Sequence, residues 1–222
     1  FKDPYRFNKN GRNVNAGYSA RNYGFEKVNG EWITFQDADD YSLRNRIEAE
    51  YELALRYDAI HVCLEWQQFK KERVGCFFDF NRALDENPNL LIDNKTISRL
   101  ADKNCGVAMK ALGKWRKHVP FEIKTMRIVN KLFFNSLESY PGSGNSPLFK
   151  KKVIEKVKFR PVDERIWPSF VGRGADRDFN FQVAKTFKKS YSFKLPMYLW
   201  RVDRENNLGY DFDKYIRPTS NE

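Results

Sequence analysis

A strand-like segment that ends in a cluster of carboxylates constrains this chain more than any other feature. Residues 31–36 (EWITFQ) have the β-branched and aromatic content of a short buried strand, and Asp37-Ala38-Asp39-Asp40 follows at once. Ser42 predicts the N-cap of a helix over residues 43–57, and residues 59–68 predict a second strand. Strands that alternate with helices indicate a layered α/β fold, with the carboxylates at the end of a strand.

The rest of the chain continues this alternation. We predict a helix over residues 19–28, a strand near 147–149, a helix near 151–157, a helix over 175–187 and a last strand over 191–201. Leu195-Pro196 predicts that the last strand lies at a sheet edge, because proline has no N–H for a neighbouring strand. The helix over 43–57 is expected to bury one face: Ile47, Tyr51, Ala54 and Leu55.

Positive charge is concentrated in two segments. The 222 residues carry a formal net charge of +11, of which residues 103–131 hold +7 and residues 149–160 hold +5. Residues 80–140 read as helices with a basic outer face. Such a face suits an anionic acceptor or an anionic membrane surface, or it is simply solvated. Lys114-Trp115-Arg116-Lys117 mixes basic and aromatic residues as nucleic-acid binders do. One such tetrad is a weak signal, so nucleic acid is an unlikely partner.

Composition narrows the class of protein further. Hydrophobic residues make up 41% of the chain, enough for a folded core. Three cysteines are too few for a disulfide scaffold, and we expect Cys63 and Cys76 to be buried thiols. No apolar run is long enough to span a membrane and no signal peptide is evident, so we expect a cytoplasmic protein, peripheral to a membrane at most.

The carboxylates of residues 37–40 have two interpretations. Clustered carboxylates repel one another unless a cation is near, and Mg²⁺ and Mn²⁺ take oxygen ligands that they share with substrate phosphates. The alternative is that these residues stabilise the start of the following helix. Residues Asp176 and Asp178 leave a similar choice, because aspartate is common at helix N-termini. Of the two histidines, His61 is expected in the core and His118 at the surface.

Several short motifs occur in an order that resembles glycosyltransferase family 2, whose members have the GT-A fold. In the first half these are Asn15-Ala-Gly17, Ala20-Arg-Asn22-Tyr-Gly24, Gly30-Glu-Trp-Ile33, Phe35-Gln-Asp-Ala-Asp-Asp40 and Asn45-Arg46-Ile47. In the second half they are Ser146-Pro-Leu-Phe149, Gly174-Ala-Asp176-Arg-Asp178-Phe179, Leu195-Pro196, Tyr198 and Trp200-Arg201. The resemblance covers about residues 13–69 and 145–205. Its first motif is one residue shorter than the family pattern between Gly17 and Ala20.

The resemblance implies a GT-A-like mixed sheet flanked by helices, with a mostly helical basic insertion. We expect a donor and metal part over residues 1–79, the insertion over 80–144 and an acceptor part over 145–222. It also implies transfer of a sugar from a nucleotide-sugar donor, most simply a UDP-sugar, to a glycan, lipid-linked or protein acceptor. The transferred group would be a hexose or an N-acetylhexosamine, and the reaction would invert the anomeric carbon.

The resemblance assigns roles on the donor side to four residues. Asp37 matches the aspartate that faces the ribose and sugar, and Asp39 matches the ligand of a Mn²⁺ or Mg²⁺ ion bridging the diphosphate. Arg21 and Asn22 match a motif that packs near the donor. Asp40 matches a further carboxylate, for which we expect a role in local structure.

On the acceptor side, Asp176 matches the general base of inverting members, and Asp178 is the second candidate. Many members carry a metal-binding histidine two residues after the last arginine, where this chain has Asp203. Carboxylate oxygens also bind Mn²⁺, so Asp203 is included with Asp37 and Asp39 as a metal ligand.

One part of the family pattern has no counterpart in this chain. Family members begin with a strand, helix and strand that hold the nucleotide base, and only 36 residues precede Asp37 here. Together with Phe1 as first residue, this predicts a truncated or split product. Two alternatives to an active transferase therefore remain: a non-catalytic or split remnant that needs a partner segment, and a basic nucleic-acid-binding module.

Overall fold

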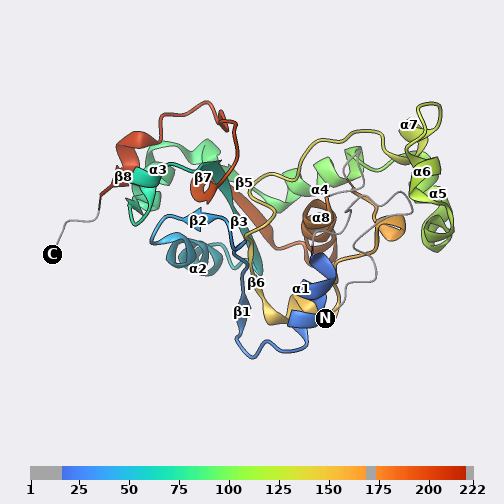
Figure 1. Ribbon diagram of the computed structural model, residues 1–222, viewed down its shortest axis with the longest axis horizontal. Coiled ribbons are helices and arrows are strands. Elements are labelled where there is room, and N and C mark those ends of the chain that lie inside the picture. Colours follow the sequence, from blue (N-terminus) through green and yellow to red (C-terminus); the bar gives the residue numbers. More distant parts are fainter. Residues whose placement is uncertain (1–16, 169–173, 219–222) are drawn as a thin grey trace. The chain divides into compact units, whose positions relative to one another are not determined.

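The computed structural model describes residues 17–168 and 174–218, which form two compact units (Figure 1). Of the described residues, one unit comprises residues 17–31, 95–140, 151–168 and 174–188, and it is helical. The other comprises residues 32–94, 141–150 and 189–218 and contains every strand of the described residues. We call them the helical unit and the sheet unit. The segment 80–144, expected as one insertion, contributes to both units, with the division at Asn94.

The sheet unit is built on a mixed sheet with the strand order β1-β6-β3-β7-β2, in which β5 also pairs with β7. Its strands are β1 (Trp32–Ile33), β2 (Tyr41–Ser42), β3 (His61–Gln68), β5 (Leu91–Ile92), β6 (Leu148–Lys150) and β7 (Ser190–Trp200). The central strands β3 and β7 are parallel and the other pairs are antiparallel. A separate ribbon pairs β4 (Phe77–Phe78) with β8 (Ile216–Arg217). The mixed α/β sheet with flanking helices that the sequence predicts is confirmed.

Helix α2 (Arg46–Arg56) packs on this sheet, but it begins and faces differently from the prediction (Figure 1). Its N-cap is Asn45, whereas Ser42 belongs to β2 and donates to Gln36. The expected buried face was wrong apart from Ala54: Ile47, Tyr51 and Leu55 are exposed. The helix instead buries Arg46, Ala49, Glu50, Leu53 and Ala54.

A buried ion pair explains this rotation of α2. Arg46 Nη1 lies 3.0 Å from Glu50 Oε2, and the same guanidinium donates to the carbonyl oxygens of Ser146 and Phe35. Burial raises the pKa of Glu50, and the Arg46 charge opposes that rise. Hydrophobic periodicity misses such a face because two of its members are charged. Strand β1 ends at Ile33 instead of continuing to residue 36, and the Phe35 carbonyl accepts a hydrogen bond from Arg46.

Strand β7 is central, so the edge position predicted from Pro196 was wrong. It pairs with β3 along its length and with β5 and β2 at its two ends on the other side. Pro196 lies where the β3–β7 register shifts, between the β5 and β2 pairings. Proline is tolerated at such an irregularity because the regular ladder is already interrupted there.

The loop over residues 141–145 crosses the carboxyl half of β3. Gly142 has φ = 100°, and a Cβ there would approach Ser192 Oγ to 2.8 Å and Cys63 Cβ to 2.9 Å. Only glycine therefore fits the backbone conformation and the space. Its N–H donates to the Glu65 carboxylate, and burial raises the pKa of that carboxyl. His61, Cys63 and Cys76 are buried as predicted, and the thiols of Cys63 and Cys76 are free.

The helical unit contains α1 (Tyr18–Phe25), most of α4 (Asn94–Lys103), α5 (Val107–Leu112), α6 (Phe121–Lys124), α7 (Asn130–Phe133) and α8 (Ala175–Phe187). The 3₁₀ turns η3 (Gly113–His118), η4 (Lys151–Glu155) and η5 (Val162–Glu164) complete it, η4 in place of the helix expected near 151–157. Between α4 and α8, Lys185 Nζ bonds both carboxylate oxygens of Asp102.

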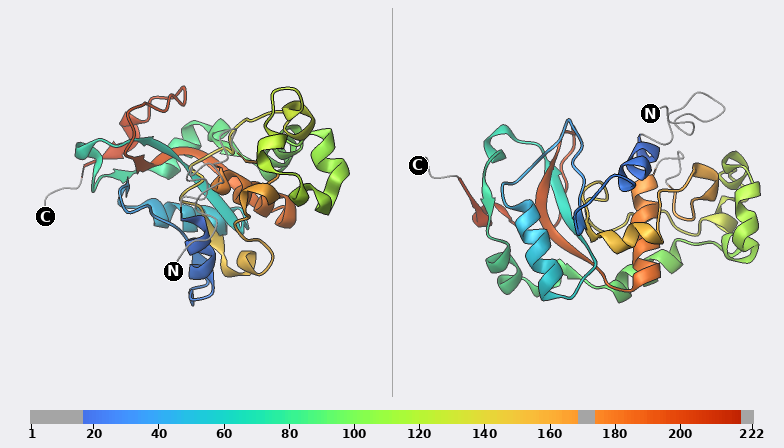
Figure 2. Two further views of the ribbon diagram at one scale, coloured as in Figure 1. Left: turned by 45° about the vertical axis from the view of Figure 1, so that its right-hand side comes forward. Right: turned by 90° about the horizontal axis from the view of Figure 1, so that it is seen from below.

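Residues 107–137 form a lobe of short helices and their connections within this unit, which we call the basic lobe (Figures 1 and 2). Its small core consists of Met109, Phe121, Phe133 and Phe134, packed with Val162 and Ile166 of the η5 segment. His118 is exposed on this lobe, as predicted. None of the described helices is long and apolar enough to cross a membrane.

Candidate functional site

The acidic loop of residues 37–40 is anchored to β7 through its last carboxylate. Asp40 is 8% exposed, and it accepts hydrogen bonds from Tyr198 Oη at 2.7 Å and from the Arg201 N–H at 2.9 Å. Burial and the hydrogen bond to Asp40 raise the pKa of Tyr198, so its hydroxyl remains a donor. The structural role predicted for Asp40 is thus supported by its contacts.

The other two carboxylates of the loop differ in exposure. Asp37 is half-buried, whereas Asp39 is exposed and has no hydrogen-bond or ion-pair partner among the described residues. Asp203, two residues beyond the Arg201 contact, is likewise exposed and unpaired among them. The described residues contain no group of three or more His, Cys, Asp or Glu side chains suited to a metal, so these aspartates are not gathered into one.

This donor set fits one kind of cation. Mg²⁺ and Mn²⁺ commonly bind through one or two carboxylates and complete their coordination with waters and substrate phosphates. An exposed Asp39, held beside an anchored Asp40, offers such a partial site. A resident structural ion would need more protein ligands than the described residues bring together.

Arg21 and Asn22 belong to the helical unit, on α1. Asn22 forms two hydrogen bonds with the backbone of Phe159, one through its Nδ2 at 2.8 Å and one through its Oδ1 at 2.9 Å. The Arg21 guanidinium lies over the Tyr18 ring, 4.7 Å from its centre. These contacts give both side chains roles in packing α1. Of the motif before them, Asn15 and Ala16 lie outside the described residues, as do Gly172 and Arg173 before α8.

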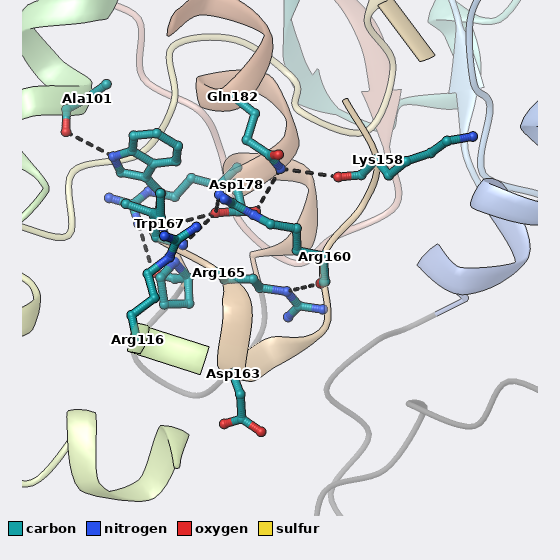
Figure 3. Close-up of polar contacts among 12 residues, drawn as sticks. Ala101, Arg116, Lys158, Arg160, Asp163, Arg165, Trp167, Asp178 and Gln182 are labelled. Atoms are coloured by element: carbon teal, nitrogen blue, oxygen red, sulfur yellow. Dashed lines mark hydrogen bonds and ion pairs between the residues drawn. The ribbon is translucent and has the colours of Figure 1, made fainter. Parts of the chain in front are cut away.

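Asp178 is the centre of a buried polar network at the start of α8 (Figure 3). Its two oxygens accept both ends of the Arg160 guanidinium, at 2.6 and 2.8 Å. They also accept the backbone N–H groups of Ile166 and Trp167 and the Gln182 amide. Burial by itself would raise the pKa of Asp178, but Arg160 and these donors outweigh it and hold the pKa below its usual value.

Asp176 has the opposite environment in the same helical turn. Its side chain is half-buried and has no hydrogen-bond or ion-pair partner among the described residues. Neighbouring Arg177 is buried and donates to the carbonyl oxygens of Glu138 and Pro168. The turn is therefore fixed by residues 177 and 178, and Asp176 is the carboxylate that is left to contact a ligand.

No local sequence pattern indicated that two cations of the helical unit, Arg160 and Lys124, bond to groups inside the protein. Arg160 and Lys124 fall in the basic segments, where both count as surface charge, but Arg160 binds Asp178. Lys124 is fully buried, and its ammonium donates to the Asp163 carbonyl. Burial lowers the pKa of Lys124 to about 8. A buried aspartate requires a cation nearby, so the position of Asp178 on a buried helix face was the one available hint.

A polar cavity of about 420 Å³ lies in the sheet unit beyond the carboxyl end of β3. Amides and carboxylates dominate its lining, among them Gln67, Gln68, Asn206, Asn207 and Asp211. The amides of Gln68 and Asn206 donate to backbone carbonyls, which leaves their oxygens as acceptors. Such a lining suits a hydroxyl-rich molecule better than an apolar one.

Comparisons with known proteins show the family to which the chain is similar. The family model described as glycosyl transferase family 2 matches residues 2–131, more than half of the chain and further than the motifs recognised up to residue 69. A protein of Methanocaldococcus jannaschii named uncharacterized glycosyltransferase MJ1057 is 25% identical over 211 residues. That alignment covers 92% of this chain and 56% of the relative, so the chain spans little more than half the relative's length.

Proposed function

Because the chain belongs to glycosyl transferase family 2, we propose that it transfers a hexose or N-acetylhexosamine from a nucleotide-sugar to a hydroxyl acceptor. The donor we propose first is a UDP-sugar, used together with Mn²⁺ or Mg²⁺. The acceptor is a glycan, a lipid-linked sugar or a protein hydroxyl. We place the protein in the cytoplasm, where thiols such as Cys63 and Cys76 stay reduced.

The observation that carries this proposal is the pairing of an anchored and an available carboxylate in the acidic loop. Asp40 fixes the loop on β7, and Asp39 next to it keeps its oxygens unpaired among the described residues. Asp39, with Asp37 beside it, would hold the cation, while Asp203 would join once donor phosphates are bound. When bound, the ion neutralises the charge that develops on the departing nucleoside diphosphate.

We assign the general base to Asp176. Its carboxylate would take the proton of the acceptor hydroxyl as that oxygen forms a bond to the anomeric carbon and the bond to the diphosphate breaks. Such a single displacement inverts the configuration of the anomeric carbon. Asp178 is unsuited to this task because Arg160, two backbone N–H groups and Gln182 occupy both of its oxygens.

Donor binding is tested by titrating UDP-sugars by calorimetry, with and without Mn²⁺. We expect binding that requires Mn²⁺ and that Asp39→Asn weakens at least tenfold, since one charged ligand is lost. Asp85→Asn, at an exposed aspartate of the same unit, is the matched control. If the unmodified chain shows no affinity with Mn²⁺, the proposal fails in favour of a split remnant that needs a further segment.

The base is tested separately. Asp176→Asn should reduce transfer by at least a hundredfold while Mn²⁺-dependent donor binding is unchanged, because general acid–base catalysis contributes about 10²–10⁴ in rate. Unchanged turnover would remove Asp176 from this role. Product analysis by NMR of the new glycosidic bond distinguishes inversion from retention.

A further inference from the structure

The basic lobe exposes large apolar side chains to an extent unmatched elsewhere in the described chain. Half of the exposed large hydrophobic residues of the described chain lie between residues 107 and 137. Ile128 is 88% exposed and Trp115 73%, and the group is completed by Val107, Ile123, Met126, Leu132 and Leu137. Exposed apolar side chains concentrated in one lobe indicate a binding surface, since exposed residues without a role would be spread over the molecule.

Contacts inside the lobe bring several of these side chains together. The Gly106 N–H donates to the Phe133 carbonyl at 2.8 Å, which places Val107 at the start of α5 beside Leu132 near the end of α7. The N–H groups of Val129 and Asn130 both donate to the Met126 carbonyl, which closes a turn with Ile128 inside it. The apolar residues therefore belong to one folded surface and not to an extended segment.

Unpaired cations lie on the same lobe as these apolar residues. Lys110, Lys114, Lys117, Arg127 and Lys131 are exposed, and none has an ion-pair partner among the described residues. The acid on the lobe is Glu122. The two cations of this stretch that are turned into the protein, Lys124 and Arg116, bond to carbonyl oxygens instead. The charges that remain on the surface are thus free to meet an anionic partner.

We propose that the basic lobe docks this protein on an anionic lipid bilayer. Bulky apolar side chains that insert below the headgroups, ringed by lysines and arginines that contact lipid phosphates, are the two features of an interfacial membrane-binding surface. Nucleic acid explains the cations but not Ile128, Met126 and Leu132. A second protein explains the apolar residues but leaves five unpaired cations without acidic partners. This inference does not depend on the proposed sugar transfer.

The test is sedimentation of the full chain with vesicles of phosphatidylcholine alone or with added phosphatidylserine. We expect binding to the phosphatidylserine vesicles that weakens as salt rises. Ile128→Ser should weaken this binding about tenfold through lost apolar burial. The double variant Lys114→Gln with Lys117→Gln should weaken it about 25-fold, at about fivefold per lysine. Trp115→Ala should weaken vesicle binding about as much as Ile128→Ser does.

Matched controls are available elsewhere on the chain. Leu55→Ser on α2 replaces a 58% exposed leucine, and Lys152→Gln replaces an exposed lysine outside the lobe. Both should leave vesicle binding unchanged, and circular dichroism should show that all variants fold. The proposal is overturned if binding survives Ile128→Ser and Trp115→Ala. It is also overturned if Ile128→Ser abolishes self-association or RNA binding of a chain that binds no vesicles.

Discussion

The acidic loop of the sheet unit and the first turn of α8 in the helical unit both carry clustered carboxylates, and their partners can be compared. Each places aspartates close together in sequence, and in each the fold buries one aspartate and leaves another without a partner among the described residues. Asp40 and Asp178 are buried and accept several hydrogen bonds, whereas Asp39 and Asp176 have no partner among the described residues. All four residues are aspartates, so the residue type does not tell an anchored carboxylate from an unpartnered one. Burial and hydrogen-bond partners do.

The two anchors differ in how their charge is balanced. Asp178 is fully buried and needs the Arg160 guanidinium, because an isolated carboxylate in a low-dielectric interior is strongly disfavoured. Asp40 lies close to the surface and is satisfied by a hydroxyl and a backbone N–H. The helical unit therefore depends on its aspartate for stability more than the sheet unit depends on Asp40.

The largest effect is expected from breaking the deeper anchor. Asp178→Asn removes the negative charge and leaves Arg160 without its partner, which should lower the free energy of unfolding by about 3–5 kcal/mol. Urea denaturation followed by helical circular dichroism measures it. Asp102→Asn, which breaks the exposed ion pair with Lys185, is the control and should cost less than about 1 kcal/mol. Equal losses of unfolding free energy in Asp178→Asn and Asp102→Asn would contradict the greater importance of the buried anchor.

Low pH should reduce the contribution of Asp178 to stability without any substitution. The folded-state pKa of Asp178 lies below its usual value near 3.8, so the folded protein holds that proton less tightly than the unfolded chain does. Its contribution to stability is present above that usual value and is lost as pH falls through the folded-state pKa. The difference in unfolding free energy between the unmodified chain and Asp178→Asn should therefore shrink below about pH 4. A difference independent of pH would show that Asp178 does not titrate as inferred.

Breaking the contacts of Asp40, the anchor nearer the surface, should lower the free energy of unfolding less. Tyr198→Phe removes the hydroxyl that donates to Asp40 and should cost about 1.5–3 kcal/mol, the range for a hydrogen bond to a charged group. Tyr51→Phe is the control, since that ring is 44% exposed and its hydroxyl has no hydrogen bond among the described residues. Thermal unfolding of the two variants side by side separates lost anchoring from a general effect of the substitution.

The fold was predictable where local pattern and tertiary packing agree. Strand β3, helix α8 and strand β7 were all predicted to within two residues, because long apolar or amphipathic segments determine them. The buried face of α2 was not, because the Arg46–Glu50 pair makes a charged face the inner one. The central position of β7 was missed because Pro196 lies at a register shift that only the pairing with β3 creates.

For the candidate site, the sequence predicted which segments carry carboxylates but not which carboxylates are used by the fold. Motif order singled out residues 37–40 and 176–178. It also ranked Asp178 as a second base, whereas the hydrogen bonds of its oxygens favour a structural role. The partner that decides this, Arg160, is 18 residues away in sequence, in a segment that reads as basic surface. Long-range partners of this kind follow no local pattern.

The smallest effect on stability is expected at the two available carboxylates, and it sharpens the comparison most. Asp39→Asn and Asp176→Asn remove no hydrogen bond or ion pair of the described residues. Asp39→Asn should change the free energy of unfolding by less than about 0.5 kcal/mol, and Asp176→Asn by at most about 1 kcal/mol, because Asp176 lies in the first turn of α8. Binding of Mn²⁺ stabilises the folded state only if the native chain binds it more tightly than the unfolded chain does. Excess Mn²⁺ with a UDP-sugar should therefore raise the melting temperature of the unmodified chain and of Asp176→Asn. The same addition should stabilise Asp39→Asn less, and an equal stabilisation of Asp39→Asn would separate metal binding from the acidic loop.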